Sequence, residues 1–386
     1  MWINSFDIGL GNGLRNRLAE AVAKNNFTLG RIYVSTTFVM LILIMGGLII
    51  VSTLLEPLVN WYEILGTTSI QVPHLKEIVY VSFLIFCLNF IFKFIGNVYL
   101  AMQLPAICSA INVTGHVISL IIIYILTLTI PGSLFWTAVA YTSSPLIVYI
   151  IAYPITFYKI FPLLRPSFSL FQKKYLKDLL NIGIQFFLLQ ISSVLLFGLA
   201  NILISHMFGP ESVTPYNIAY RYFSLVPMAM NIILAPMWSA TTDAYAKGDI
   251  EWIRKSIQKI HKFLIITLTI LVSMVLVSNF VYKIWIGTEV TIPITMSILM
   301  AVYVFIIISS LTYSNFLNGL GKLKLQTINT VTVALLFCPL CWFLGNILGI
   351  YGILVGMCIV NTSGLLLNRI QFYKVLNGVA SGIWDK

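Results

Sequence analysis

The sequence predicts an all-α membrane protein that crosses the bilayer many times, and three observations support this fold class. Of its 386 residues, 59% are hydrophobic and only 9% are charged, whereas soluble proteins carry about 25% charged residues. The mean hydropathy is +0.96. The apolar residues fall in runs of at least about 20, the length of a spanning helix and twice that of a barrel strand. The composition therefore excludes a soluble enzyme and a single-pass anchor.

Ten segments are long and apolar enough to be complete spans. Because the backbone in lipid must form its own hydrogen bonds, each is expected to be a helix. The expected spans are residues 33–54, 78–102, 106–130, 134–157, 180–206, 213–236, 263–286, 291–316, 327–346 and 349–368.

An internal repeat accounts for the unusual start of the chain. Residues 1–10 are too short to span the bilayer, yet they lead into a basic segment as the end of a span would. Residues 20–26 (EAVAKNN) match residues 243–249 (DAYAKGD) at an offset of 223. At this offset the chain is expected to begin inside the second helix of a six-helix unit.

The repeat predicts two pseudo-symmetric helical bundles around a central cavity. The N-terminal bundle, residues 1–157, is expected to hold four complete spans. Residues 158–178 are expected to form a cytoplasmic linker, and residues 179–386 a C-terminal bundle of six spans.

The basic residues predict the orientation of these spans. One set of loops, together with the C-terminus, carries nineteen Lys and Arg, whereas the opposite set carries only Lys76 and Lys283. The first of the basic loops includes Arg15, Arg17 and Arg31. Since basic loops stay in the cytoplasm, the C-terminus is predicted to be cytoplasmic.

A separate amphipathic helix is expected at residues 249–262. Ile250, Ile253, Ile257 and Ile260 follow helical spacing, and the basic residues lie off that face. Such a helix is typical of the membrane interface, where it anchors to anionic lipid. Binding of a regulator or partner is the alternative.

Polar residues recur at intervals of three and four within several spans. These stripes are Asn89, Lys93 and Asn97; Ser109, Asn112, His116 and Ser119; Asn181, Gln185 and Ser192; and Thr214, Asn217, Arg221, Ser224 and Asn231. A transporter must line a wet cavity with such groups, and stripes in both halves predict one shared cavity.

The cations in these stripes indicate the charge of the cargo. No Asp or Glu lies inside a complete span, and the planar fork of an arginine suits phosphate. We therefore expect an anionic cargo bound by Arg221, Lys93, Asn217, Asn89 and His116. Alternatively, the two cations extend to the membrane surface, and His116 makes an interhelical hydrogen bond.

The sequence shows no pattern typical of an enzyme or a metal site. Its five cysteines lie within apolar runs, which predicts small core residues rather than disulfides. Residues 318–323 (NGLGKL) lack the first glycine and the final Ser or Thr of a phosphate loop. We expect no catalysis, cofactor or nucleic-acid partner. A proton or a sodium ion stays open as the coupling ion, with His116 and His206 as candidate proton carriers.

Three motifs resemble a known family. They are residues 6–16 (FDIGLGNGLRN), 215–223 (PYNIAYRYF) and 235–240 (APMWSA). Together they resemble the Wzx-type polysaccharide flippases of the MATE-like (multidrug, oligosaccharidyl-lipid and polysaccharide) exporter superfamily, and the resemblance covers the whole chain. Within them, structural roles are expected for Asp7, Asn12, Arg15, Tyr216 and Pro236.

The resemblance implies a function and a location. It implies two six-helix lobes that work by alternating access in the bacterial inner membrane. The implied cargo is undecaprenyl pyrophosphate carrying an O-antigen or capsule repeat unit, with polysaccharide polymerase and glycosyltransferases as partners. The chain departs from the family pattern because it lacks the first helix and most of the second, so we expect this form to insert into the membrane but to be unstable or inactive.

Two other functions fit parts of the sequence. A MATE-type drug or cation antiporter is disfavoured by the absence of acids within the spans. A membrane-bound glycosyltransferase or ligase needs acidic or histidine residues in large outer loops. The loop 55–77, with Glu56, Glu63 and His74, keeps that alternative open.

The predicted orientation can be tested by cysteine labelling. Gly66→Cys lies in a predicted outer loop and Lys173→Cys in a predicted cytoplasmic segment. A membrane-impermeant thiol reagent added from outside should label only Gly66→Cys in intact cells, and Lys173→Cys only after lysis. Labelling of both in intact cells would contradict the topology.

Overall fold

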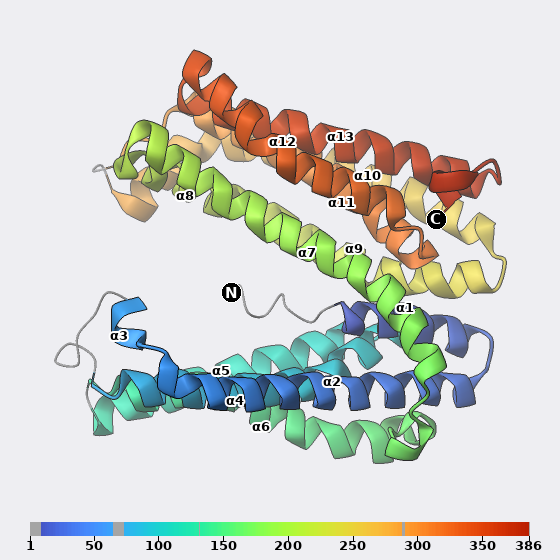
Figure 1. Cartoon of the computed structure of the whole chain (residues 1–386). Helices are drawn as coiled ribbons and strands as arrows, with labels where there is room; N and C mark the ends of the chain where they lie inside the picture. Colours follow the sequence, from blue (N-terminus) through green and yellow to red (C-terminus); the bar gives the residue numbers. More distant parts are fainter. Residues whose placement is uncertain (1–8, 65–72, 131, 288–289, 386) are drawn as a thin grey trace. The chain divides into compact units, whose positions relative to one another are not determined.

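The computed structural model describes residues 9–64, 73–130, 132–287 and 290–385, and this part of the chain is helical with no strands (Figure 1). The α-helices are α1 (Leu10–Ala23), α2 (Phe27–Leu55), α3 (Trp61–Ile64), α4 (Leu75–Ala101), α5 (Pro105–Thr129), α6 (Leu134–Pro154), α7 (Lys173–Phe208), α8 (Val213–Phe223), α9 (Leu225–Ala246), α10 (Ile250–Ile286), α11 (Ile294–Leu320), α12 (Lys324–Leu348) and α13 (Ile350–Leu376). Short helical turns are η2 (Glu56–Leu58), η3 (Ile155–Ile160), η4 (Pro162–Leu164), η5 (Phe168–Leu170), η6 (Pro210–Ser212) and η7 (Gly382–Asp385).

These helices confirm an all-α polytopic membrane fold. Within the described residues, nine helical segments are long and apolar enough to cross a membrane, and each coincides with an expected span. Three of the nine are composite: α2 continues into η2, α6 continues into η3, and η6, α8 and α9 form one segment. The tenth expected span, residues 180–206, lies inside α7, a continuous helix of 36 residues.

The chain divides into two compact units, which we call the N-terminal unit (residues 10–181) and the C-terminal unit (residues 182–386). Each has its own apolar core. Phe94 and Phe157 are among the fully buried side chains of the first, and Phe316 and Phe372 of the second. The bounds predicted for the two bundles stay a prediction.

The segment expected as a linker packs on α2 of the N-terminal unit. The backbone N–H of Ser167 donates to Ser35 Oγ at 3.1 Å, and that of Gln172 donates to Thr36 Oγ1 at 3.4 Å. Arg31 Nε donates to the carbonyl of Arg165 at 2.8 Å. Residues 161–172 therefore cover the first turns of α2.

The repeat appears in the structure as two matching helix–turn–helix segments, α1–α2 and α9–α10. The first helix ends at Ala23 and at Ala246, and the second begins at Phe27 and at Ile250. Both pairs are 223 residues apart, which is the offset found in the sequence.

The local geometry of the two turns also matches. Asn26 Oδ1 accepts from the N–H of Leu29 at 3.0 Å, as Asp249 Oδ1 accepts from that of Trp252 at 2.9 Å. Both are helix N-caps, which satisfy an otherwise unpaired donor of the first turn. The preceding residue has a positive φ in each copy, 54° at Asn25 and 77° at Gly248. Asparagine and glycine are the residues that tolerate this conformation best.

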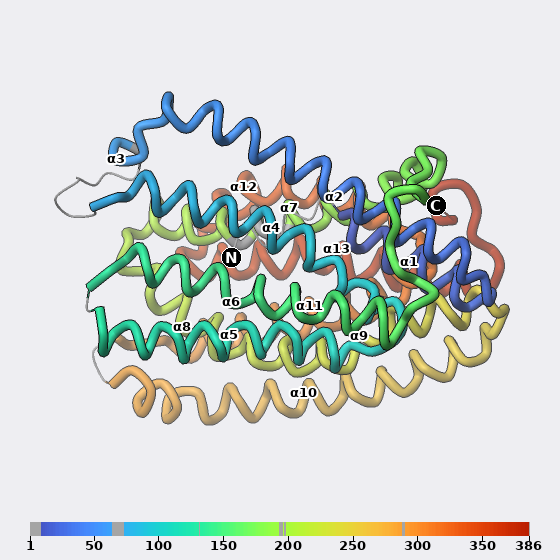
Figure 2. Tube along the Cα trace, turned by 90° about the horizontal axis from the view of Figure 1, so that it is seen from below, coloured from blue at the N-terminus to red at the C-terminus, as the bar shows by residue number. Residues whose placement is uncertain are grey.

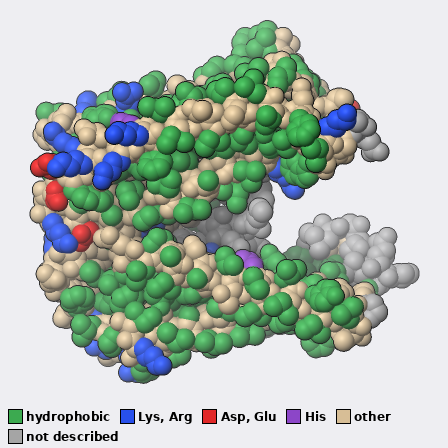
Figure 3. All heavy atoms as spheres, turned by 180° about the vertical axis from the view of Figure 1, so that it is seen from behind, with side chains coloured by type: hydrophobic (Ala, Val, Ile, Leu, Met, Phe, Trp, Pro, Cys, Tyr) green, Lys and Arg blue, Asp and Glu red, His purple; other side chains and the backbone are tan. Residues whose placement is uncertain are grey.

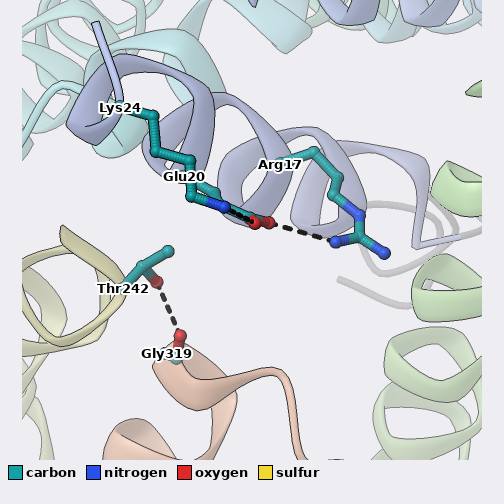
Figure 4. A network of polar contacts seen from close by, with 5 residues as sticks. All are labelled: Arg17, Glu20, Lys24, Thr242 and Gly319. Carbon is teal, nitrogen blue, oxygen red and sulfur yellow. Dashed lines mark hydrogen bonds and ion pairs between the residues drawn. The ribbon is translucent and has the colours of Figure 1, made fainter. Parts of the chain in front are cut away.

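An acid–lysine pair precedes each turn. Glu20 contacts Lys24 Nζ at 2.8 Å and Arg17 at 3.1 Å (Figure 4), and Asp243 contacts Lys247 Nζ at 2.9 Å. Burial alone would raise the pKa of Glu20, but the hydrogen bond and charge of Lys24, together with Arg17, lower it overall. The repeated motif is therefore an ion pair, a left-handed residue and an N-cap.

A close approach of α9 and α11 fixes part of the C-terminal unit. Thr242 Oγ1 donates to the carbonyl of Gly319 at 2.8 Å (Figure 4). A Cβ atom at Gly319 would lie 2.5 Å from the carbonyl oxygen of Trp238. Only glycine allows the two helices this separation.

The structure corrects the expected first loop. Residues 10–23 form α1, because Leu10, Leu14 and Leu18 repeat every four residues and are fully buried on one face. Arg15, expected in a basic loop, lies in this helix and is only 4% exposed.

The expected interface helix at 249–262 is also wrong as a separate element. It is the first part of α10, which runs unbroken to Ile286 (Figure 2). Ile253, Ile257 and Ile260 are buried in a core with Phe316 and Phe372 instead of facing lipid. Helical periodicity indicates that a face is buried, but not whether lipid or protein covers it. Here the face packs against protein.

The matched turns generate a stability prediction. Gly248→Ala should lower stability by about 1 kcal/mol, because an L-residue is strained at positive φ while no atom lies within 4 Å of the added Cβ. Asn25→Gly, at the matching position, should leave stability unchanged or slightly higher. Thermal unfolding of the purified variants in detergent measures both. An unchanged Gly248→Ala protein would show that the turn relaxes.

Candidate transport site

A polar cluster lies inside the N-terminal unit. Tyr149 of α6 donates its hydroxyl to Asn112 Oδ1 of α5 at 2.8 Å, and Asn112 Nδ2 donates to the carbonyl of Cys108 at 2.9 Å. Arg15 of α1 and Lys93 of α4 both lie near the Cys108 side chain. Four helices therefore bring two cations, an amide and a phenol together, and we call these five residues the cationic cluster.

Close packing of α4 on α5 brings Lys93 near this cluster. A Cβ atom at Gly96 would lie 3.1 Å from Cys108 Sγ, so the small residue lets the helices approach. Arg15 is almost fully buried, whereas Lys93 is half-buried. The basic residues around Arg15 predicted a loop, so its place beside Lys93 was not expected. Its place between Leu14 and Leu18 was the signal for a helix.

Asn89 lies one turn before Lys93 on α4. Its Nδ2 donates to the carbonyl of Thr142 on α6 at 2.7 Å. Its Oδ1 is buried and has no hydrogen-bond partner among the described residues. A buried carbonyl oxygen normally has a partner, so this atom is suited to accept from water or from a hydroxyl of a bound molecule.

The polar stripe of α5 is divided between two faces. Asn112 and Ser119 are packed within the unit, whereas Ser109 and His116 are exposed. The His116 ring lies beside Tyr141, with 6.4 Å between ring centroids. The structure therefore does not bring His116 into the cationic cluster.

In the C-terminal unit, α8 has one polar and one buried face. Thr214 and Arg221 are exposed, whereas Tyr216, Ala219 and Phe223 are fully buried in the core. Among the described residues, the ion pairs involve other cations, so no carboxylate neutralises Arg221. The helix presents this guanidinium away from its own core.

Asn217, one turn before Arg221, connects α8 to α7. Its Nδ2 donates to Asn201 Oδ1 at 2.8 Å. Asn201, Ser205 and His206 line a shallow pocket of about 680 Å³ between the two helices. The pocket thus offers amide, hydroxyl and imidazole groups next to the polar face of α8.

The motif residues occupy packing positions rather than this polar surface. Tyr216 is fully buried and its hydroxyl faces Met357 Sδ at 3.7 Å. Pro236 lies inside α9, and Asn12 is half-buried in α1. Asp7 lies outside the described residues.

The Asp and Glu residues in the described part of the chain are not clustered as the ligands of a metal ion would be. They lie in loops or within about two turns of a helix end, as Asp178 and Glu77 do. No group of three His, Cys, Asp or Glu residues in the described chain is placed to hold a metal ion.

Comparison with known proteins identifies the family. Residues 4–242 match the family described as polysaccharide biosynthesis protein. The chain belongs to this family. A relative from Yersinia pseudotuberculosis, assigned a role in O-antigen export, is 23% identical over 365 residues, which are 92% of this chain and 81% of the relative.

Solved structures show that this polysaccharide biosynthesis protein has the fold of MATE-type transporters. An outward-facing MATE transporter of the MOP superfamily matches with a TM-score of 0.82 at 16% identity, over 98% of this chain and 86% of that one. A MATE protein in a bent conformation matches with 0.82 at 17% identity, over 99% and 87%. A MOP superfamily transporter from Pyrococcus furiosus matches with 0.78 at 16% identity, over 98% and 86%.

The exposure of the polar face of α8 can be tested chemically. In a background without native cysteines, Arg221→Cys should react with a charged, water-soluble thiol reagent, because this position is exposed beside polar neighbours. Ala219→Cys, fully buried on the other face, is the matched control and should stay unlabelled. An unreactive Arg221→Cys protein would place this position against lipid.

Proposed function

We propose that this protein moves undecaprenyl-pyrophosphate-linked oligosaccharide, an O-antigen or capsule repeat unit, across the bacterial inner membrane by alternating access. The observation that carries the proposal is the charge of its polar surfaces. Each unit carries cations within its helical segments, the half-buried Lys93 beside the buried Arg15 in one and the exposed Arg221 in the other, and the described acids stay near helix ends or in loops. Such surfaces suit a pyrophosphate.

The mechanism follows from the cost of moving a charged head group through hydrocarbon. The lipid tail stays in the bilayer, while the pyrophosphate and sugars enter from the cytoplasmic side and bind to the polar helix faces. Cationic side chains replace the water that the pyrophosphate loses, and the planar fork of Arg221 holds two oxygens at once. The bundles then rock, and the head group leaves on the outer side.

Neutral polar groups suit the sugars. The α7–α8 pocket offers Asn201, Ser205 and His206, and Asn217 donates to Asn201 at 2.8 Å. Sugar hydroxyls both donate and accept hydrogen bonds, so amides, hydroxyls and an imidazole complement them. A shallow pocket also accepts a bulky head group without enclosing it.

The relatives support this reading. The Yersinia protein is assigned to O-antigen export, and the report on the Pyrococcus transporter describes a binding pocket of reversed polarity and suggests a different function. A cytoplasmic C-terminus, coupling to a proton or a sodium ion, and cooperation with a polymerase and glycosyltransferases complete the proposal.

Two other functions fit the structure less well. A drug or cation antiporter shares the fold but needs a carboxylate deep in a span, where the described chain has none. A glycosyltransferase needs free acids in an outer loop. Of the acids named for that role, Glu56 pairs with Lys76 at 3.0 Å, and the exposed Glu63 accepts from Asn60 Nδ2 at 3.4 Å; His74 lies 3.5 Å from Glu77.

The cargo proposal predicts the effect of removing single cations. Arg221→Ala and Lys93→Ala should each lower surface polysaccharide at least tenfold in cells that depend on this gene, because one charge-assisted contact to phosphate is worth about 1.5–3 kcal/mol. Arg221→Lys should restore export only in part, since the bidentate contact is lost. Immunoblotting of the membrane fraction checks that protein levels are equal.

Lys177→Ala serves as the control, because this exposed lysine lies in the first turns of α7, outside both the cationic cluster and the α7–α8 pocket. It should export normally. Wild-type export by both Arg221→Ala and Lys93→Ala would contradict the anionic cargo site.

A further inference from the structure

One face of α10 is both basic and exposed. Lys255, Lys259 and Lys262 follow at intervals of four and three, so they lie on the same side of the helix, and all three are exposed. The opposite side, with Ile253 and Ile257, is buried in the core of the C-terminal unit. Lys and Arg side chains gather over the corresponding end of this unit in Figure 3.

The lysine face continues directly into an apolar one. Ile266 and Ile270 follow Lys262 at intervals of four, and their exposed fractions are 53% and 44%. A helix surface that changes from exposed isoleucine to exposed lysine within one turn marks the boundary between hydrocarbon and lipid head groups. The three ammonium groups therefore lie at head-group level.

The repeat shows that this face differs from its counterpart. At the offset of 223, the three lysines correspond to Ile32, Thr36 and Val39 of α2. There, residues 161–172 cover the helix, and Thr36 is fully buried beneath the backbone of Gln172. The covered copy therefore carries no charge on this face.

In the C-terminal unit the segment after α13 does not pack on α10 in this way. After α13 the chain folds against α12 and α13, where Asp385 pairs with Lys322 at 2.8 Å and Lys374 lies 4.0 Å from the Trp384 ring centroid. Within the described residues, nothing covers the lysines of α10. Of the two matching faces, the one that is uncovered in the described residues is the basic one.

We propose that Lys255, Lys259 and Lys262 form a binding site for the head groups of anionic phospholipids. Lys255 Nζ forms an ion pair with Glu251 Oε1 at 2.6 Å, whereas Lys259 and Lys262 have no ion pair among the described residues. Ammonium groups beside a lipid-exposed apolar face complement a phosphate whose acyl chains lie along that face. The site depends on this charge pattern and not on the identity of the cargo.

Lipid competition tests the site on the full chain. The purified, delipidated protein is mixed with equal amounts of phosphatidylglycerol and phosphatidylcholine, and bound lipids are counted by native mass spectrometry. The wild type should prefer phosphatidylglycerol. In the triple variant Lys255→Gln, Lys259→Gln, Lys262→Gln, the ratio of bound phosphatidylglycerol to bound phosphatidylcholine should fall at least fivefold. This is about the effect expected from the loss of one surface lysine.

Two further variants make the outcome decisive. Replacing the exposed Lys173, Lys174 and Lys177 of α7 by Gln removes the same charge and should keep most of the preference, whereas Arg at the three α10 positions should retain it and exclude misfolding as the cause. An unchanged preference in the α10 Gln variant would overturn the proposal, and that result is expected if the face binds an acidic protein. Equal losses in both Gln variants would also overturn it, since any basic surface would then suffice.

Discussion

The cost of an unsatisfied polar group in hydrocarbon is the constraint on which this structure depends. It forces the backbone into helices that pair their own N–H and C=O groups, and it places most charges at helix ends, where Glu20 and Asp243 pair with Lys24 and Lys247. The same cost makes Lys93 and Arg221 conspicuous. A cation at such a position needs water or an anion close by, so the constraint that builds the fold also marks the surface that a charged cargo would use.

Length and periodicity were enough to predict the spans and the repeat, because both follow from local chemistry. The seven-residue match at 20–26 and 243–249 became two turns with the same caps and the same left-handed residue. The sequence could not show whether an apolar helix face contacts lipid or protein. Ile253 and Ile257 show helical amphipathicity whether lipid or protein buries them, and only the packing of α10 against Phe316 distinguishes the two.

The candidate site was predictable residue by residue but not as an arrangement. The spacing of Ser109, Asn112, His116 and Ser119 predicts that they share one side of a helix. In the structure only part of that side packs against other helices, and His116 is exposed. Arg15 joins Lys93 near Cys108 only because α1 is a helix. Spacing fixes an angle around one helix axis, whereas a site depends on where neighbouring helices lie.

Matching positions in the two copies of the repeat show which side chains the fold requires. Helices α4 and α11 begin at Leu75 and Ile294 and end at Ala101 and Leu320, so both ends are 219 residues apart. Lys93 then corresponds to Thr312, a buried residue whose hydroxyl bonds to its own helix at 3.0 Å. At the offset of 223, Arg15 corresponds to Trp238. The same helical frame thus forms with neutral side chains at both positions. The frame therefore does not need these two cations, which agrees with the proposal that the N-terminal unit uses them to bind an anion.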